Sequence, residues 1–208
     1  MPWFGRVIAF ALKPLYWLLL PRVTVTDPWR PSTSWVTWSS VSSGVKQDFG
    51  WYLSGETSVH PTSVPEVCDW LAGCVYATDE ELFHEPDFWQ HPKTLEHLRK
   101  GDCDDFAVWA WRNLLEIGID ARLFIGKRLP SDGSLHRHAW VSYESDGRRF
   151  LLEPTAVRET MIRSFDDAKA TYLPYFSVGR DCKLISHEGY LVYLQERDLK
   201  SRRGRQAA

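Results

Sequence analysis

Three residues of this chain have the side chains that a thiol nucleophile needs. Cys103 lies in the segment 101–107, whose sequence is GDCDDFA, and His138 and Glu153 follow it along the chain. A thiolate attacks a carbonyl carbon, an imidazole moves the proton, and a carboxylate holds the imidazole in its orientation. If the fold brings the three together, they form a triad for acyl transfer to sulfur.

The cysteine is expected in the first turn of a helix. Apolar side chains in residues 104–117 recur at helical spacing, Asp102 is a suitable N-cap, and Gly118 ends the pattern. The N-terminus of a helix carries partial positive charge and free N–H groups, which lower the pKa of a thiol and stabilise an oxyanion. The neighbouring aspartates act in the opposite direction, so a protonated histidine or a bound cation has to offset them.

The histidine and the glutamate are expected on the two strands of a β-hairpin. The dipeptide DG at 146–147 separates two β-prone runs, 138–143 and 149–153, and is a strong turn signal. With a two-residue turn, His138 and Glu153 are diagonal neighbours on one face of the hairpin. A three-residue loop would place them on opposite faces, so the register tests the triad.

Other segments show weaker local patterns. Helices are expected within 61–76, where Ser63 can cap the first turn, and around 94–98. Strands are expected at 121–125 and at 190–194, the second completing the sheet.

The chain divides by composition into four parts. Residues 1–22 form an apolar arm, 23–60 an extended irregular segment, 61–197 the domain with the three residues, and 198–208 a basic mobile tail. The arm is too interrupted by polar residues and proline for a membrane span, and no cleavable signal peptide is recognised in it. It either docks on a protein partner or a membrane surface, or packs as a helix on the protein's own core; we favour docking.

Composition narrows the class of protein. The chain has 208 residues, a formal net charge of −2 and 44% hydrophobic residues, which fits a globular domain and gives no reason to expect nucleic acid as a partner. The eleven tryptophans are expected in the core rather than in an aromatic ligand cleft. The four cysteines match no zinc pattern and indicate free thiols, so we expect a cytoplasmic protein, associated or not with a membrane or an assembly.

Residues 89–155 resemble the transglutaminase-like cysteine peptidase superfamily, and most closely its bacterial members. The matching residues are the GDCDDFA segment, Leu114, Leu115, Gly118, Ile119, Ala121, Arg122, Gly126 and the HAWV run at 138–141. The resemblance implies a papain/transglutaminase-like α+β fold, in which N-terminal helices include the nucleophile helix and this helix packs on a small antiparallel sheet. It also implies Cys103 as nucleophile, His138 as general base and then acid, and an acid after the hairpin, here Glu153, as the group that orients the histidine.

The resemblance extends less closely to other parts of the site. The family usually has Asp or Asn as the third residue, so the longer Glu153 serves only if its strand lies slightly further back. By looser analogy, Trp89 or Gln90 would stabilise the oxyanion. In some bacterial members the acids beside the cysteine bind calcium, which makes Asp102 and Asp104 candidate Ca²⁺ ligands. Helix capping and charge complementary to the helix dipole are the alternative role of these two aspartates, and the one we favour.

A zinc site is the competing use of the histidines. His136 and His138 form an H-x-H pair that could bind zinc together with Cys103, but no further ligand stands at suitable spacing. We therefore rank metal binding by these residues well below catalysis.

These observations lead to one expected function and two alternatives. We expect a thiol-dependent hydrolase that cleaves a peptide or isopeptide bond of a protein or peptide substrate through an acyl-thioester on Cys103, with no required cofactor. An acyl transferase, a transglutaminase, would use the same site with an amine in place of water. A non-catalytic structural or interaction module of a larger assembly would retain the fold without the activity.

Overall fold

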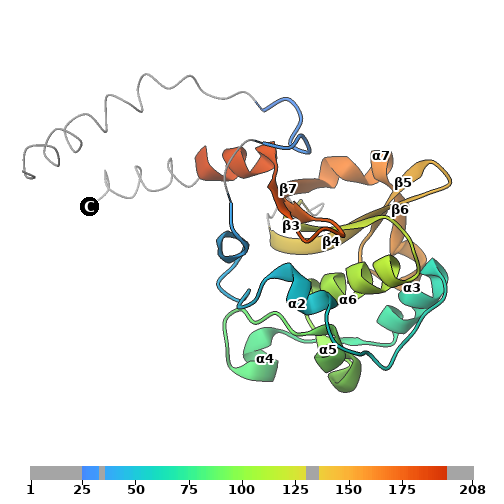
Figure 1. Ribbon diagram of the computed structural model, residues 1–208. Coiled ribbons are helices and arrows are strands. Elements are labelled where there is room, and N and C mark those ends of the chain that lie inside the picture. The colour runs from blue at the N-terminus through green and yellow to red at the C-terminus, as the bar shows by residue number, and fades with distance from the viewer. Residues whose placement is uncertain (1–24, 33–35, 130–135, 196–208) are drawn as a thin grey trace, which may run out of the picture.

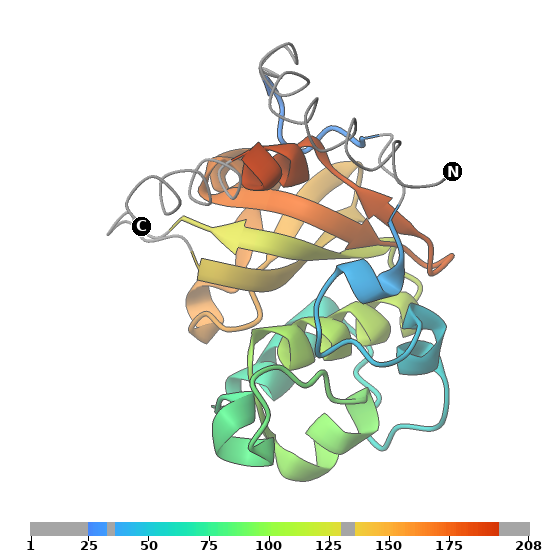
Figure 2. The same cartoon turned by 90° about the vertical axis from the view of Figure 1, so that its left-hand side faces the viewer.

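The computed structural model describes residues 25–32, 36–129 and 136–195. The predicted arm 1–22 and the basic tail 198–208 lie outside the described residues. In the described part, a layer of helices packs against one face of a sheet, and short helical segments lie on the other side of the sheet (Figure 1). The view turned by 90° shows the same two layers from the side (Figure 2).

Six of the described strands form one sheet in which every neighbouring pair is antiparallel. Its order is β6-β5-β4-β3-β7-β8. The strands are β3 (Ala121–Arg128), β4 (His136–Ser145), β5 (Arg148–Leu152), β6 (Ile162–Ser164), β7 (Tyr172–Val178) and β8 (Leu184–Ser186). A separate parallel pair joins β1 (Val75–Tyr76) to β2 (Lys100–Gly101).

The helices of the other layer precede the sheet along the chain. They are α2 (Phe49–Leu53), α3 (Val64–Ala72), α4 (Asp79–Phe83), α5 (Pro92–Leu98) and α6 (Cys103–Glu116). The short helix α7 (Phe165–Ala168) lies on the other side of the sheet, and 3-10 turns lie at Trp38–Ser40, Arg158–Thr160 and Lys169–Thr171. The predicted helices around Ser63 and around 94–98 are confirmed as α3 and α5, and the Ser63 side chain accepts the N–H of Glu66 as a cap. This α+β architecture, with a cysteine-bearing helix on a small antiparallel sheet, is the one that the resemblance implies.

The strand predicted at 190–194 is wrong, because residues 188–195 are helical. Tyr190 and Tyr193 both contact Tyr175, with ring centroids 5.9 and 5.0 Å away. Side chains three residues apart share a face only on a helix, so packing on β7 selects the helix over the β propensity of the run.

The core lies on both faces of the sheet. On one face, α6 packs on apolar side chains of β3 and β4, including Leu123 and Val141, and its own Trp109 and Trp111 are fully buried. On the other face, a second cluster joins Phe124, Trp140, Leu151, Ala168 and Tyr172. The expectation that tryptophans enter the core is confirmed for Trp89, Trp109, Trp111 and Trp140. Replacing one of these tryptophans by Ala would lower the free energy of unfolding by about 3–5 kcal/mol.

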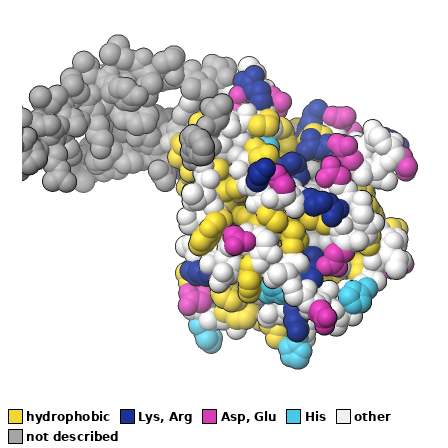
Figure 3. Space-filling model, viewed as in Figure 1, with side chains coloured by type: hydrophobic (Ala, Val, Ile, Leu, Met, Phe, Trp, Pro, Cys, Tyr) yellow, Lys and Arg dark blue, Asp and Glu magenta, His cyan; other side chains and the backbone are white. Residues whose placement is uncertain are grey.

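Two surface properties bear on partners. None of the described helices is both long enough and apolar enough to cross a membrane. On the face seen in Figure 3, acidic and basic side chains are interspersed, and no broad area of one charge covers it.

Candidate active site

Cys103 is the first residue of α6, as predicted, and Asp102 caps the helix. The Asp102 carboxylate accepts the N–H of Asp104 at 3.2 Å, and the Asp105 carboxylate accepts the N–H of Asp102 at 3.2 Å. Gly118 adopts φ +86°, which releases the chain after the last turn. The cysteine therefore stands where a helix presents its unpaired N–H groups and partial positive charge.

The short β1–β2 pair fixes how the chain enters α6. Tyr76 lies beside Gly101 in the parallel register, directly before the cap. A Cβ on Gly101 would lie 2.5 Å from Oδ2 of Asp105, so this approach leaves no room for a side chain. Tyr76 is 55% exposed and contacts Phe106, and burial of its hydroxyl and the nearby Cys103 sulfur raise its pKa. Tyr76 is thus a neighbour of the thiol that sequence reasoning did not find.

The hairpin has the predicted register. Val141 faces Leu152, Ser145 faces Arg148, and the two turn residues 146 and 147 have φ values of 52° and 68°, as a type I′ turn requires. This register brings His138 and Glu153 together, as expected for a two-residue turn. The Nε2 atom of His138 lies 2.7 Å from Oε2 and 2.8 Å from Oε1 of Glu153.

Glu153 is buried, and hydrogen bonds hold it in its ionised form. Tyr172 donates its hydroxyl to Oε2 at 2.7 Å, Thr155 donates its hydroxyl to Oε1 at 2.8 Å, and Arg128 lies 3.8 Å away. Burial alone would raise the pKa of Glu153, but the bonds from His138, Tyr172 and Thr155 overcome it and lower the pKa to about 2. The extra methylene of Glu, compared with Asp, does not prevent contact with His138.

Cys103 meets β4 at the residue that follows His138. The backbone N–H of Ala139 is close enough to lower the pKa of the Cys103 thiol, and the charge of Glu153 is close enough to raise it. Burial, followed by the charges of Asp104 and Asp102, raises the pKa of the Cys103 thiol well above its ordinary value.

The imidazole of His138 lies on the side of β4 that carries Trp140 and Tyr172, with ring centroids 6.3 and 6.4 Å away. With Nε2 bonded to Glu153, Nδ1 is the ring nitrogen left for the thiol. Among the hydrogen bonds of the described residues, none joins this ring to the sulfur of Cys103. Nucleophile–base bonds are often long in the absence of substrate.

Trp89 and Gln90 are the two residues expected by analogy to stabilise the oxyanion. In the structure they lie beside α6, where they contact other residues of the protein. Trp89 is buried against Phe49 and Tyr52. The side-chain amide of Gln90 donates to Asp105 and to the carbonyl of Lys100, and its backbone N–H donates to Asp105 as well. Gln90 therefore anchors the start of α6 to β2.

A group of five aspartates, the aspartate cluster, surrounds the start of α6. Its members are Asp79, Asp87, Asp102, Asp104 and Asp105. These residues form three overlapping sets, and within each set the ligand atoms lie within 4.8 Å of one another. The sets are Asp102 with Cys103 and Asp104, Asp79 with Asp102 and Asp105, and Asp79 with Asp87 and Asp104. No such set within the described ranges includes His136 or His138, so the zinc alternative finds no support there.

The aspartate cluster has more carboxylate oxygens than the described hydrogen-bond donors satisfy. Oδ1 of Asp79 and Oδ1 of Asp104 are buried and have no hydrogen-bond partner among the described residues. Burial and the neighbouring carboxylates raise the pKa of Asp79 to about 6 and those of Asp104 and Asp105 well above their ordinary range. Several carboxylate oxygens facing one point are the donor set of a hard divalent cation such as Ca²⁺, so the residues present fit that ion.

Sequence reasoning named Asp102 and Asp104 and missed Asp79 and Asp87. The parallel β1–β2 pair explains why. The N–H of Ala77 donates to the carbonyl of Gly101, so the chain leaves both strands at the same edge, with Asp79 soon after one and Asp102 directly after the other. A strand of two residues is too short to show a hydrophobic periodicity in the sequence. The acidic first turn of α4 was the one local signal that could have pointed to Asp79.

Comparisons with known proteins find distant structural neighbours. LapG from Legionella pneumophila is 18% identical over 76% of this chain and 80% of that chain, with a TM-score of 0.48. Its calcium-bound form is 19% identical over 66% and 75%, with a TM-score of 0.47, and its EGTA-treated form is 18% identical over 62% and 69%, with a TM-score of 0.44. No protein-family model and no curated protein matches the chain. Likeness at this level carries no functional argument, so the residues themselves have to supply it.

Proposed function

We propose that this chain is a thiol-dependent hydrolase that cleaves an amide bond of a peptide or protein through an acyl-thioester on Cys103. One observation carries the proposal. The sulfur at the N-terminus of α6 contacts the N–H of Ala139, and the preceding residue, His138, is bonded to an ionised Glu153. We infer that nucleophile, base and orienting acid, which come from three separate elements, act together during the reaction.

The first step forms the thioester. His138 takes the proton of Cys103 at Nδ1, and the thiolate adds to the carbonyl carbon of the scissile bond. The N–H of Cys103, at the first position of α6, would donate to the oxyanion. The C–N bond then breaks, and the amine leaves with the proton from His138.

The second step releases the acid. His138 takes a proton from water, the hydroxide adds to the thioester carbonyl, and the C–S bond breaks. The thiolate regains the proton through His138, which restores the starting state. Throughout, Glu153 keeps Nε2 occupied and stabilises the imidazolium, since the hydrogen bonds from His138, Tyr172 and Thr155 hold it ionised.

Calcium is part of the proposal. Asp79, Asp102 and Asp104, with Asp87 beside them, would hold a Ca²⁺ ion. When bound, the ion supplies positive charge that offsets the carboxylates next to the thiol.

A peptide or protein substrate fits the surroundings of the thiol. Val75 and Tyr76 form β1, which pairs with the strand that leads into α6, and their side chains are 56% and 55% exposed. An apolar surface of this kind covers the backbone and side chains of an extended peptide.

A substrate-independent experiment tests the proposal. p-Nitrophenyl acetate should give a burst of nitrophenol and one added acetyl group on the intact protein, mapped to Cys103 by mass spectrometry. Cys103→Ala should abolish the burst, whereas Cys182→Ser, which removes another free and partly exposed thiol, should leave it unchanged. Acetylation spread evenly over the four cysteines would favour the non-catalytic module.

Adding an amine separates hydrolase from transferase. If water attacks the thioester, methylamine should leave the rate of deacetylation unchanged. An increase in this rate with methylamine concentration, with N-methylacetamide as product, would instead identify an acyl transferase.

A further inference from the structure

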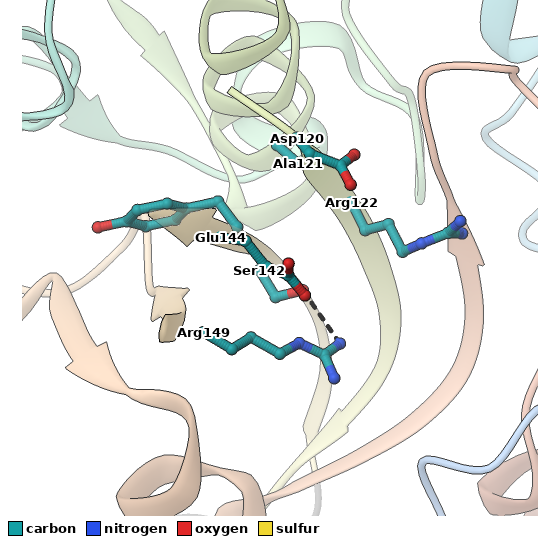
Figure 4. A pocket seen from close by; sticks show the side chains of 7 residues that line it. Asp120, Ala121, Arg122, Ser142, Glu144 and Arg149 are labelled. Carbon is teal, nitrogen blue, oxygen red and sulfur yellow. Dashed lines mark hydrogen bonds between the residues drawn. The ribbon is translucent and has the colours of Figure 1, made fainter. Parts of the chain in front are cut away.

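A pocket of about 210 Å³ lies at the end of the β3–β4–β5 part of the sheet (Figure 4). It is lined by Arg122, Arg149, Ser142, Tyr143, Asp120 and Glu144. Arg122 and Ser142 face each other across β3 and β4. Ser142 is four residues along β4 from His138, which places the pocket about 13 Å from that residue. It is therefore separate from the candidate active site.

The guanidinium of Arg149 is held in place without an ion pair. It lies 3.9 Å from the ring centroid of Phe165 and 5.9 Å from that of Trp29, and it donates to Oγ of Ser142 at 3.3 Å. The aromatic contacts and the single bond to Ser142 fix its direction, and they leave most of its five N–H groups free. Burial lowers the pKa of Arg149, and Arg122 adds to this effect while Glu144 opposes it.

Arg122 is the second cation of the pocket. Its Nη1 atom is buried and has no hydrogen-bond partner in the described part of the chain. Its guanidinium packs on the backbone of Gly179, where an added Cβ would lie 3.1 Å from Nη2. Within the part of the chain that the structure describes, neither Arg122 nor Arg149 belongs to a salt bridge.

Two half-buried guanidinium groups line one pocket and repel each other, and no described salt bridge joins them to Asp120 or Glu144, so an anion bound between them would lower this repulsion. Their field also reaches His187, whose pKa is lowered first by burial and then by both arginines. We propose that this pocket binds a small oxyanion, with Arg122 and Arg149 as charged donors and the hydroxyl of Ser142 as a third donor. The bound oxygens would accept the free N–H groups and separate the two positive charges.

The pocket also limits which oxyanion fits. Its volume is below the roughly 300–1,000 Å³ of sites for drug-sized ligands, so a single phosphate or a short carboxylate suits it. Asp120 and Glu144 carry negative charge at the same pocket, which disfavours long polyanions.

Calorimetric titration of the full chain at constant ionic strength tests the proposal, with inorganic phosphate in one arm and succinate in the other. Constant ionic strength is needed because salt screens exposed charges. The wild type should bind at least one of the two at a single site, and the tighter arm identifies the source of the oxyanion. Arg122→Gln and Arg149→Gln should each weaken binding about tenfold or more, because each removes charge-assisted donors.

Arg148→Gln is the matched control, because Arg148 is adjacent on β5 and exposed. It should bind as the wild type does. Since Arg149 also supports packing, Arg149→Lys provides a variant that keeps the charge and should bind more weakly than wild type but more tightly than Arg149→Gln. Cys103→Ala should bind normally, which separates this test from that of the hydrolase. Absence of binding in both arms, or equal binding by the wild type and Arg122→Gln, would overturn the proposal.

Discussion

Two buried carboxylate centres lie near Cys103, and the protein treats them in opposite ways. Glu153 receives hydrogen bonds from His138, Tyr172 and Thr155, and its pKa falls to about 2. In the aspartate cluster, Asp79 and Asp104 each leave an oxygen without a partner, and their pKa values are raised. Glu153, Asp79 and Asp104 are all buried, so the difference lies in the hydrogen-bond donors and in the neighbouring carboxylates.

The contrast indicates different roles. A carboxylate whose acceptors are filled is rigid and permanently charged, which suits a group that orients an imidazole. Carboxylates that repel one another and lack donors favour a state in which a proton or a cation joins them. The predictions below test this distinction, from the largest expected effect to the smallest.

Removing the imidazole should have the largest effect. In His138→Ala, the rate constant for acetylation of Cys103 by p-nitrophenyl acetate should fall about 1,000-fold, because general-base catalysis contributes roughly 10²–10⁴. His136→Ala, two residues away on the same strand and exposed, should stay near the wild-type rate. Equal rates for His138→Ala and the wild type would remove His138 from the mechanism.

Glu153→Gln should lower the free energy of unfolding by about 3 kcal/mol at neutral pH. The folded-state pKa of about 2 lies below the ordinary 4.5, so the stabilisation is complete above pH 4.5 and is lost as the pH falls toward 2. Urea unfolding at pH 7 and pH 3 should therefore give a large difference between variant and wild type at pH 7 and a smaller one at pH 3. A difference that does not change with pH would mean that Glu153 is not held ionised.

Calcium should stabilise the aspartate cluster and leave Glu153 unaffected. At a free Ca²⁺ concentration of 100 times Kd, the gain in the free energy of unfolding should be about 2.7 kcal/mol. Asp104→Asn should lose most of this gain, because it removes a carboxylate with an unpartnered oxygen. Asp167→Asn, an exposed aspartate outside the cluster, is the matched control. If EGTA and Ca²⁺ give the same unfolding midpoint for the wild type, the cluster does not bind calcium.

Tyr172→Phe should have the smallest effect. The loss of one hydrogen bond to the ionised Glu153 should lower the free energy of unfolding by about 1.5 kcal/mol and reduce Cys103 acetylation severalfold. Tyr190→Phe, whose ring packs on Phe176 in the other core cluster without a described hydroxyl bond, should change neither quantity appreciably. An unchanged acetylation rate in Tyr172→Phe would show that Glu153 orients His138 without this donor.

Part of the site could be predicted because its signals are local. The N-cap at Asp102, the end of α6 at Gly118 and the turn at 146–147 each depend on a few adjacent residues, and each is observed. A two-residue turn determines the register of the whole hairpin, so the contact between His138 and Glu153 follows from it.

Contacts between distant segments could not be predicted. Tyr172 comes from β7, and no local pattern connects its hydroxyl to Glu153. The helix at 188–195 was mistaken for a strand, because a short apolar run suits both structures until its packing on β7 decides.

The sequence by itself determined where Cys103 stands and that His138 and Glu153 can meet, because capping, helix termination and turn chemistry act over a few bonds. Only the tertiary structure decided which further charges share a site. Parallel pairing of two short strands brought Asp79 to Asp102, and strand pairing brought Arg122 and Arg149 to one pocket. Such groups are far apart in the chain, and their electrostatic energy depends on burial and distance, which exist only once the core has formed.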